Sequence, residues 1–162
     1  MEQKNLSIQY SQYQHASELP EIWAHLLQDA HKSIASSYAP YSDFHVGAAV
    51  LLENDIIVCG SNQENAAYPL GLCAERVALF AASSHYPGVK VKAIAITAHT
   101  NSFVIENPIS PCGACRQVMI EYENLHQQNI VIILSGETGP IWVFEDAVSI
   151  LPFSFNSKNL SK

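Results

Sequence analysis

The stretch GLCAERVALF (residues 71–80) places Cys73 two positions before a glutamate, at the start of an apolar helical pattern. A second stretch, PCGACRQVM (residues 111–119), opens another helical pattern with Cys112 and Cys115 in a Cys-x-x-Cys spacing. Helix N-termini carry partial positive charge, which favours thiolates over thiols. Three of the chain's four cysteines therefore lie where thiolates are stabilised.

Three thiolates at such spacing favour Zn²⁺ over the harder cations Mg²⁺ and Ca²⁺. We expect Cys73, Cys112 and Cys115 to be the metal ligands, which leaves the fourth position of a tetrahedral zinc open for water, as in catalytic sites. Taken alone, the Cys-x-x-Cys pair also fits a redox pair or half of a structural zinc site. Cys59 is either a fourth ligand that closes the site or a buried core cysteine, and its apolar strand context favours the core.

Two neighbours of Cys73 favour catalysis. Glu75 can exchange a proton with a water at the metal, although a glutamate also suits the first turn of a helix. Arg76 can hydrogen-bond a ligand sulfur and withdraw charge from it, a role open to Arg116 as well. The other reading of Arg116 is an exposed partner of Glu121 or Glu123.

The remaining pattern predicts one α/β domain. Apolar periodicity indicates a helix from Leu19 to about Ser37, and two further helices begin at the two cysteine stretches. Five strands are expected, at residues 44–52, 56–61, 91–98, 129–135 and 140–145, the first two forming a hairpin. Residues 7–13 alternate weakly and can add a short edge strand. The order of helices and strands predicts a three-layer α/β/α sandwich with a mixed five-stranded sheet.

Composition narrows the class of protein. The 162 residues are 48% hydrophobic and 14% charged, as in a globular domain. We expect a single domain over residues 1–162, with residues 1–18 and 156–162 peripheral. The net charge of -7 argues against nucleic acid or an anionic membrane as a partner. The first residues lack the apolar core of a signal peptide, so we expect a cytoplasmic protein, in which clustered cysteines indicate metal binding or catalysis rather than disulfides.

The two cysteine stretches together resemble the zinc-dependent cytidine deaminases of the small homotetrameric type. In the wider zinc-deaminase signature a histidine takes the first ligand position, and here Cys73 stands in its place, as in the three-cysteine branch. The resemblance extends from near Pro20 to Phe155. It is carried by four segments, SYAPYSDFHVGAAVL, GSNQENAAYPLGLCAERVALF, SPCGACRQV and ILPFSF.

The resemblance implies roles for further residues. Asn62 and Glu64 would bind the ribose 3′-hydroxyl, and Phe44 would pack on the pyrimidine ring. The Ala74 N–H would meet the 2-oxygen of the base, and the Ser110 carbonyl would accept from its 4-amino group. Tyr68 and Phe155 would reach the site of a neighbouring subunit in a homotetramer. Taken without the resemblance, NQEN (62–65) reads as a polar turn and Phe44 and Phe155 as packing residues.

The implied reaction is hydrolytic deamination of cytidine and 2′-deoxycytidine to uridine and 2′-deoxyuridine with release of ammonia, a step of pyrimidine salvage. The implied cofactor is one Zn²⁺ per subunit, and Glu75 would move the protons. Three alternatives stay open: a deaminase of another small aminopyrimidine such as blasticidin S, a non-catalytic structural zinc domain, and a thiol-redox protein. The NQEN segment and Arg76 favour the nucleoside enzyme.

Overall fold

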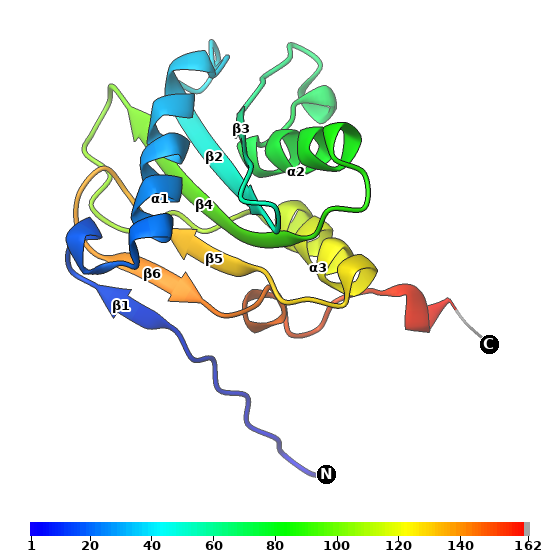
Figure 1. The fold of residues 1–162 in the computed structure, drawn as a ribbon. Coiled ribbons are helices and arrows are strands. Elements are labelled where there is room, and N and C mark those ends of the chain that lie inside the picture. The colour runs from blue at the N-terminus through cyan, green and yellow to red at the C-terminus, as the bar shows by residue number, and fades with distance from the viewer. Residues whose placement is uncertain (161–162) are drawn as a thin grey trace.

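The computed structural model describes residues 1–160 as one mixed sheet covered by helices on both faces (Figure 1). Three α-helices are present, α1 (Glu21–Ser33), α2 (Ala74–His85) and α3 (Gly113–His126). The strands are β1 (Ser11–Tyr13), β2 (Phe44–Leu52), β3 (Ile57–Ser61), β4 (Val91–Thr100), β5 (Val131–Leu134) and β6 (Ile141–Phe144). The expected order of helices and strands is confirmed.

The sheet has six strands rather than the expected five, in the order β1-β6-β5-β4-β2-β3. The additional strand is β1, which pairs antiparallel with β6 through Ser11↔Val143 to Tyr13↔Ile141. Only β4 and β5 run parallel; the other neighbouring pairs are antiparallel. The prediction of a mixed sheet was therefore correct, and its strand count was wrong by one edge strand.

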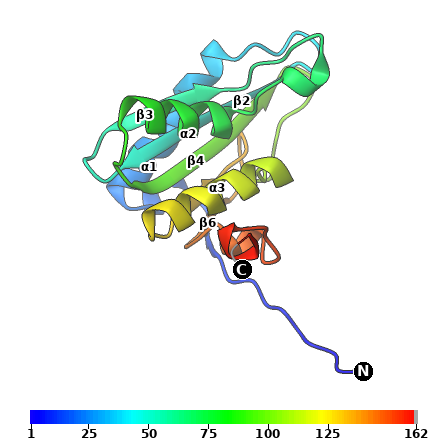
Figure 2. The same ribbon diagram turned by 90° about the vertical axis from the view of Figure 1, so that its right-hand side faces the viewer.

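The helices form two outer layers, which confirms the three-layer sandwich. Helix α1 covers one face of the sheet, and α2 and α3 lie side by side on the other (Figures 1 and 2). Buried residues form one cluster on each face: Ala48, Val50, Ile94 and Ile96 alternate toward α2 and α3, and Ala49, Leu51, Ala93 and Ala95 alternate toward α1. This alternation is what a sheet buried on both faces requires.

Strand β3 lies close against α2, the helix that begins with the GLCAER stretch. The closest approach is at Gly60, where an added Cβ would lie 2.5 Å from the Ala78 nitrogen and 2.7 Å from the Ala74 oxygen. A side chain therefore has no room at this position. The contact fixes the first turn of α2 against the sheet.

The two ends of the chain lie outside the sandwich. The chain before Tyr10 extends away from the body of the molecule (Figure 1). The C-terminal part contains a short 3-10 turn at Val148–Ile150 and another at Ser157–Asn159. Of the segment 156–162 that we expected to be peripheral, residues 161 and 162 lie outside the described residues. None of the helices in the described residues has the length and apolar character to cross a membrane.

Candidate active site

The sulfurs of Cys73, Cys112 and Cys115 converge between the first turns of α2 and α3. The Sγ atoms of Cys73 and Cys112 are 3.8 Å apart, those of Cys112 and Cys115 are 3.4 Å apart, and all three lie within 4.8 Å of one another. Zn–S bonds of about 2.3 Å in tetrahedral geometry separate two ligand sulfurs by about 3.8 Å. The three side chains thus match the donor set and spacing of a zinc site.

Local structure explains the convergence. Cys73 and Cys112 are the N-cap residues of α2 and α3, both with extended backbone angles, and Cys115 is the third residue of α3. Each sulfur is therefore close to helix N–H groups that have no acceptor within the helix, which stabilises negative charge. The prediction that the cysteines lie at two helix N-termini is confirmed.

The protonation of the three sulfurs is strongly interdependent. A hydrogen bond from the Cys115 thiol, with a further one from Arg76, lowers the pKa of Cys73 to about 5. The same contact with the Cys73 thiolate raises the pKa of Cys115. Three sulfurs this close favour a shared cation, because a divalent ion can replace the thiol protons and neutralise most of the charge. The donor set therefore fits Zn²⁺.

Arg76 lies against this cluster, as the sequence suggested. Its Nη2 atom donates to the Cys73 Sγ at 3.7 Å and to the Gly71 carbonyl at 3.5 Å. Arg116 does not serve the cluster in this way, nor does it pair with Glu121 or Glu123. It donates to the carbonyls of Pro111 and Ile150, both at 2.7 Å, and so joins the start of α3 to the C-terminal segment.

Cys59 lies apart from the three-sulfur cluster, on β3. Its side chain is exposed, and its thiol donates to the Asp29 carbonyl at 3.8 Å. Both readings of Cys59 were therefore wrong: it is neither a fourth ligand nor a core residue. The strand pattern was read correctly, but β3 is an edge strand that leaves this side chain accessible.

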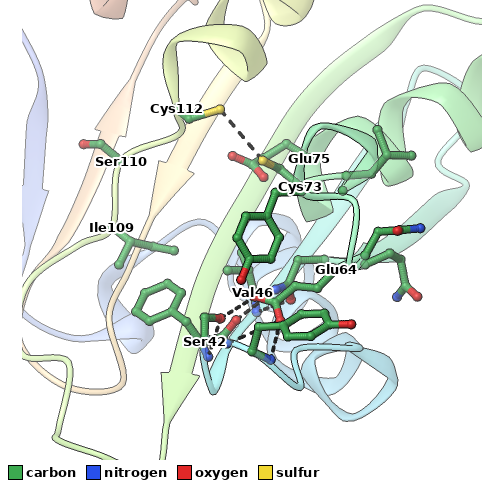
Figure 3. Close-up of a pocket in the computed structure, with 16 residues that line it drawn as sticks. Ser42, Val46, Glu64, Cys73, Glu75, Ile109, Ser110 and Cys112 are labelled. Atoms are coloured by element: carbon green, nitrogen blue, oxygen red, sulfur yellow. Dashed lines mark hydrogen bonds between the residues drawn. The ribbon is translucent and has the colours of Figure 1, made fainter.

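Glu75 is nearly buried, with 4% of its surface exposed, and it lines a cavity beside the cysteines. Figure 3 shows its carboxyl group next to Cys73 on the side of the cavity. Burial is the main cause that raises the pKa of Glu75. A carboxyl group whose pKa is raised toward neutrality can both accept and donate a proton under physiological conditions.

The cavity has a volume of about 890 Å³ and opens to the surface. It collects most of the residues that the resemblance pointed to. These are Phe44, Asn62, Glu64, Tyr68, Cys73, Glu75, Ser110 and Cys112. In Figure 3 the sulfurs and Glu75 lie at one end of the cavity and Glu64 at the other. Segments separated by up to about 70 positions in the chain thus form one elongated site.

The polar end of the cavity has internal contacts that the sequence did not reveal. The Asn62 side chain accepts from the Val46 N–H at 2.7 Å and donates to the Phe44 carbonyl at 2.8 Å. The Glu64 carboxylate accepts from the Tyr41 N–H at 2.8 Å and from the Ser42 hydroxyl at 2.5 Å. Ser42, in the segment YAPYSD (38–43) just before β2, was not among the predicted site residues. A serine placed just before a strand is the signal that could have indicated this contact.

Four other predicted residues lie outside the lining of the cavity: Cys115, whose sulfur belongs to the three-sulfur cluster, and Ala74, Arg76 and Phe155. Ala74 is fully buried at the first position of α2, so only its backbone is available at the site. Arg76 lies behind Cys73, as described above. Phe155 is 58% exposed and its backbone exchanges hydrogen bonds with the Gln117 side chain, so within one subunit it does not reach the cavity.

Comparison with known proteins points to one family. Residues 21–132 match the family described as the cytidine and deoxycytidylate deaminase zinc-binding region. The cytidine deaminase of Sporosarcina psychrophila is 41% identical over 137 residues, which cover 84% of this chain and 93% of the relative. The cytidine deaminase of Halalkalibacterium halodurans is 39% identical over 84% of this chain and 96% of its own length.

Solved structures agree with these relatives. The crystal structure of cytidine deaminase from Burkholderia pseudomallei superposes with a TM-score of 0.70 at 41% identity, covering 81% of this chain and 97% of that chain. The enzyme from Mycobacterium tuberculosis gives a TM-score of 0.63 at 31% identity, covering 83% and 97%. With the three-sulfur cluster and the matching fold, these similarities show that the chain belongs to the zinc-dependent cytidine deaminase family.

Proposed function

We propose that this protein hydrolyses cytidine and 2′-deoxycytidine to uridine and 2′-deoxyuridine with release of ammonia, as a step of pyrimidine salvage. The observation that carries the proposal is the position of the Glu75 carboxyl, beside three convergent cysteine sulfurs in a cavity large enough for a nucleoside. A structural zinc domain needs neither a buried carboxyl beside the ligands nor a cavity.

Cys73, Cys112 and Cys115 would hold the zinc ion. When bound, Zn²⁺ lowers the pKa of a water molecule toward neutrality and so makes a nucleophile available at physiological pH. Arg76 donates to the Cys73 sulfur and so reduces the charge that this ligand transfers to the ion.

Glu75 is proposed to carry the protons of the reaction. Its carboxylate accepts a proton from the attacking water and delivers it to N3 of the pyrimidine, which makes C4 more electrophilic. After C4 has bonded to the water oxygen, Glu75 transfers the second proton to the 4-amino group, and the C–N bond breaks to release ammonia. The raised pKa of the buried carboxyl supports both roles, because the group must be protonated and deprotonated in one cycle.

The cavity supports one orientation for the nucleoside. With C4 of the base toward Glu75 and the sulfurs, the ribose points to the end that holds Glu64. We assign the ribose 3′-hydroxyl to Asn62 and Glu64 and the face of the pyrimidine to the Phe44 ring. The Ala74 N–H and the Ser110 carbonyl would bind the 2-oxygen and the 4-amino group. The Ala74 N–H directly follows the Cys73 ligand, and the Ser110 carbonyl lies two residues before the Cys112 ligand.

We further propose a cytoplasmic homotetramer in which Tyr68 and Phe155 complete the site of a neighbouring subunit. Both rings are exposed, Tyr68 to 75% and Phe155 to 58%. Both side chains are therefore accessible to a neighbouring subunit.

The test is a direct assay on the purified protein. Cytidine should lose its absorbance in parallel with ammonia release, and the protein should contain about one zinc ion per chain, as three thiolate ligands imply. Bound zinc without turnover of cytidine would indicate a structural zinc domain instead. Turnover of blasticidin S but not of cytidine would identify the related antibiotic deaminase. Reduction of disulfides by a metal-free protein would indicate thiol-redox chemistry.

A further inference from the structure

We propose that Ser42 is a positioning residue for nucleoside recognition: its hydroxyl holds the Glu64 carboxylate in the orientation that receives the ribose 3′-hydroxyl. The inference rests on the proposed function, because it assigns the ribose to the Glu64 end of the cavity. Ser42, from the loop before β2, thereby joins the residues that recognise the nucleoside.

The contacts of Glu64 are divided unequally between its two oxygens. Oε2 accepts from the backbone N–H of Tyr41 at 2.8 Å and of Ser42 at 3.4 Å. Oε1 accepts from the Ser42 hydroxyl at 2.5 Å. Figure 3 shows these contacts as dashed lines between Glu64 and the Ser42 region at the end of the cavity away from the sulfurs.

This division indicates which oxygen meets the substrate. Each carboxylate oxygen has about two acceptor positions. The two N–H donors occupy both positions on Oε2, whereas the single hydroxyl on Oε1 leaves one position open. A ribose hydroxyl is therefore expected to donate to Oε1, the oxygen that Ser42 orients.

The Ser42 hydroxyl also connects the two ends of the nucleoside site. While it donates to Glu64, its oxygen accepts from the Phe44 N–H at 3.1 Å. Phe44 begins β2, and its ring lines the cavity where the pyrimidine is proposed to bind. One hydroxyl thus sets the Glu64 carboxylate relative to the strand that carries the base-packing ring.

A pair of substrates isolates this role from general effects on the site. Cytidine offers the 3′-hydroxyl to Glu64, and 3′-deoxycytidine lacks it but keeps the same base. If Ser42 acts through Glu64 on that hydroxyl, its removal should affect only the first substrate. A loosened loop or a displaced Phe44 would affect both substrates alike.

The experiment compares steady-state constants of the zinc-loaded wild-type enzyme with Ser42→Ala on both substrates. Because the Ser42 hydroxyl bonds a charged carboxylate, we expect its removal to raise KM for cytidine roughly tenfold. The kcat for cytidine and both constants for 3′-deoxycytidine should stay within about a factor of two, since the chemistry at C4 is untouched. Ser42→Thr, which keeps the hydroxyl, should restore most of the affinity.

Two further variants complete the design. Ser102→Ala removes an exposed hydroxyl from the loop after β4, outside the cavity lining, and should leave all constants unchanged. In the Glu64→Gln background, the additional change Ser42→Ala should alter KM for cytidine little further, because Ser42 acts on the substrate only through Glu64.

If Ser42→Ala raises KM equally for cytidine and 3′-deoxycytidine, or leaves KM for cytidine unchanged, the positioning role is overturned. Either result leaves the deaminase assignment intact. A wild-type enzyme that converts neither nucleoside would instead overturn the proposed function itself.

Discussion

Glu75 lines the cavity next to Cys73 without belonging to the proposed ligand set. We expect Glu75→Gln to lower kcat by at least about 100-fold, because the amide can neither accept nor deliver the protons of deamination. Zinc content should remain near that of the wild type, since no ligand is removed. Metal analysis and an absorbance assay on the same sample check both points, and a mutant with near-normal turnover would refute the proton-transfer role.

Arg76 is expected to act on the metal site through the Cys73 sulfur. Replacing it with glutamine removes a cation that donates to this sulfur at 3.7 Å. Loss of such a partner typically weakens metal binding by about 10- to 100-fold, so the variant should release zinc to a chromogenic chelator at a lower chelator concentration. Lys32→Gln, which removes an exposed cation on α1, is the control. Identical release curves for both variants would show that Arg76 does not support the site.

The ligand set could be predicted from single residues, but the supporting contacts could not. A cysteine at a helix N-terminus has a local physical signature, which is why Cys73, Cys112 and Cys115 were identified. The Ser42–Glu64 contact joins residues 22 positions apart, and nothing in either short segment shows that β2 and β3 bring them together. Arg116 was misread for the same reason, because its partner carbonyl at Ile150 is 34 positions away.

Among the elements, the contact of β3 with α2 holds in place the helix that begins at Cys73, one of the three proposed ligands. We expect Gly60→Ala to lower the free energy of unfolding by roughly 1–3 kcal/mol, because the new methyl group meets backbone atoms of α2 that cannot rotate away. Denaturant unfolding measures the loss. Gly113→Ala is the matched control, since an added Cβ there meets nothing within 4 Å. Equal stability of the two variants would mean that α2 shifts freely.

Helix α3 is anchored at its other end by a buried acid. The Glu123 Oε1 atom accepts from the backbone N–H groups of Ile130 and Ala147, both at 2.8 Å. Glu123→Ala leaves two buried donors without an acceptor and should cost about 2–4 kcal/mol of unfolding free energy. Glu123→Gln keeps an acceptor oxygen and should cost much less. Similar unfolding midpoints for the alanine and glutamine variants would contradict this anchoring role.

The same acid gives stability a defined pH dependence. Burial raises the pKa of Glu123 above its value in the unfolded chain. The folded protein therefore binds this proton more tightly, so the stability contribution is complete below the unfolded pKa of about 4.3 and is lost as the pH rises through the folded value. The unfolding free energy of the wild type relative to Glu123→Gln should fall between pH 4 and neutrality. A rise over that interval would contradict the assignment.

The predictable elements are those with a strong local pattern. The five predicted strands and three helices follow from apolar periodicity, prolines and helix N-terminal signals in the chain. Strand β1 was read only as a possible edge because it spans Ser11–Tyr13 and depends on pairing with β6, about 130 residues away. Tyr10, just before it, lies with its ring 5.4 Å from those of Trp142 and Phe144. Short strands such as β1 depend on contacts of this kind, which join residues far apart in the sequence and cannot be predicted from a local sequence pattern.

At the scale of the whole molecule, the cavity opens to the surface, and one of its lining residues is largely exposed there. The cavity mouth carries Tyr68, whose ring lies 5.9 Å from that of Tyr41, and both rings are exposed. Phe155, in contrast, does not line the cavity, and its backbone is hydrogen-bonded to the Gln117 side chain. If both residues serve catalysis, the geometry requires that Phe155 does so in another copy of the chain.

That requirement predicts complementation between two defective subunits. In solution we expect a particle of four 17.8 kDa chains by light scattering. Phe155→Ala should lower kcat/KM for cytidine by about 10-fold or more, on the scale of a lost aromatic anchor, without changing zinc content.

Mixing Phe155→Ala with Glu75→Gln under conditions of subunit exchange should then restore activity, because some sites combine an intact Glu75 with a neighbour's Phe155. Phe153→Ala, which removes an exposed ring two residues earlier, is the control. A monomer in solution, or activity in mixtures no higher than the sum of the separate variants, would show that each subunit works with its own residues alone.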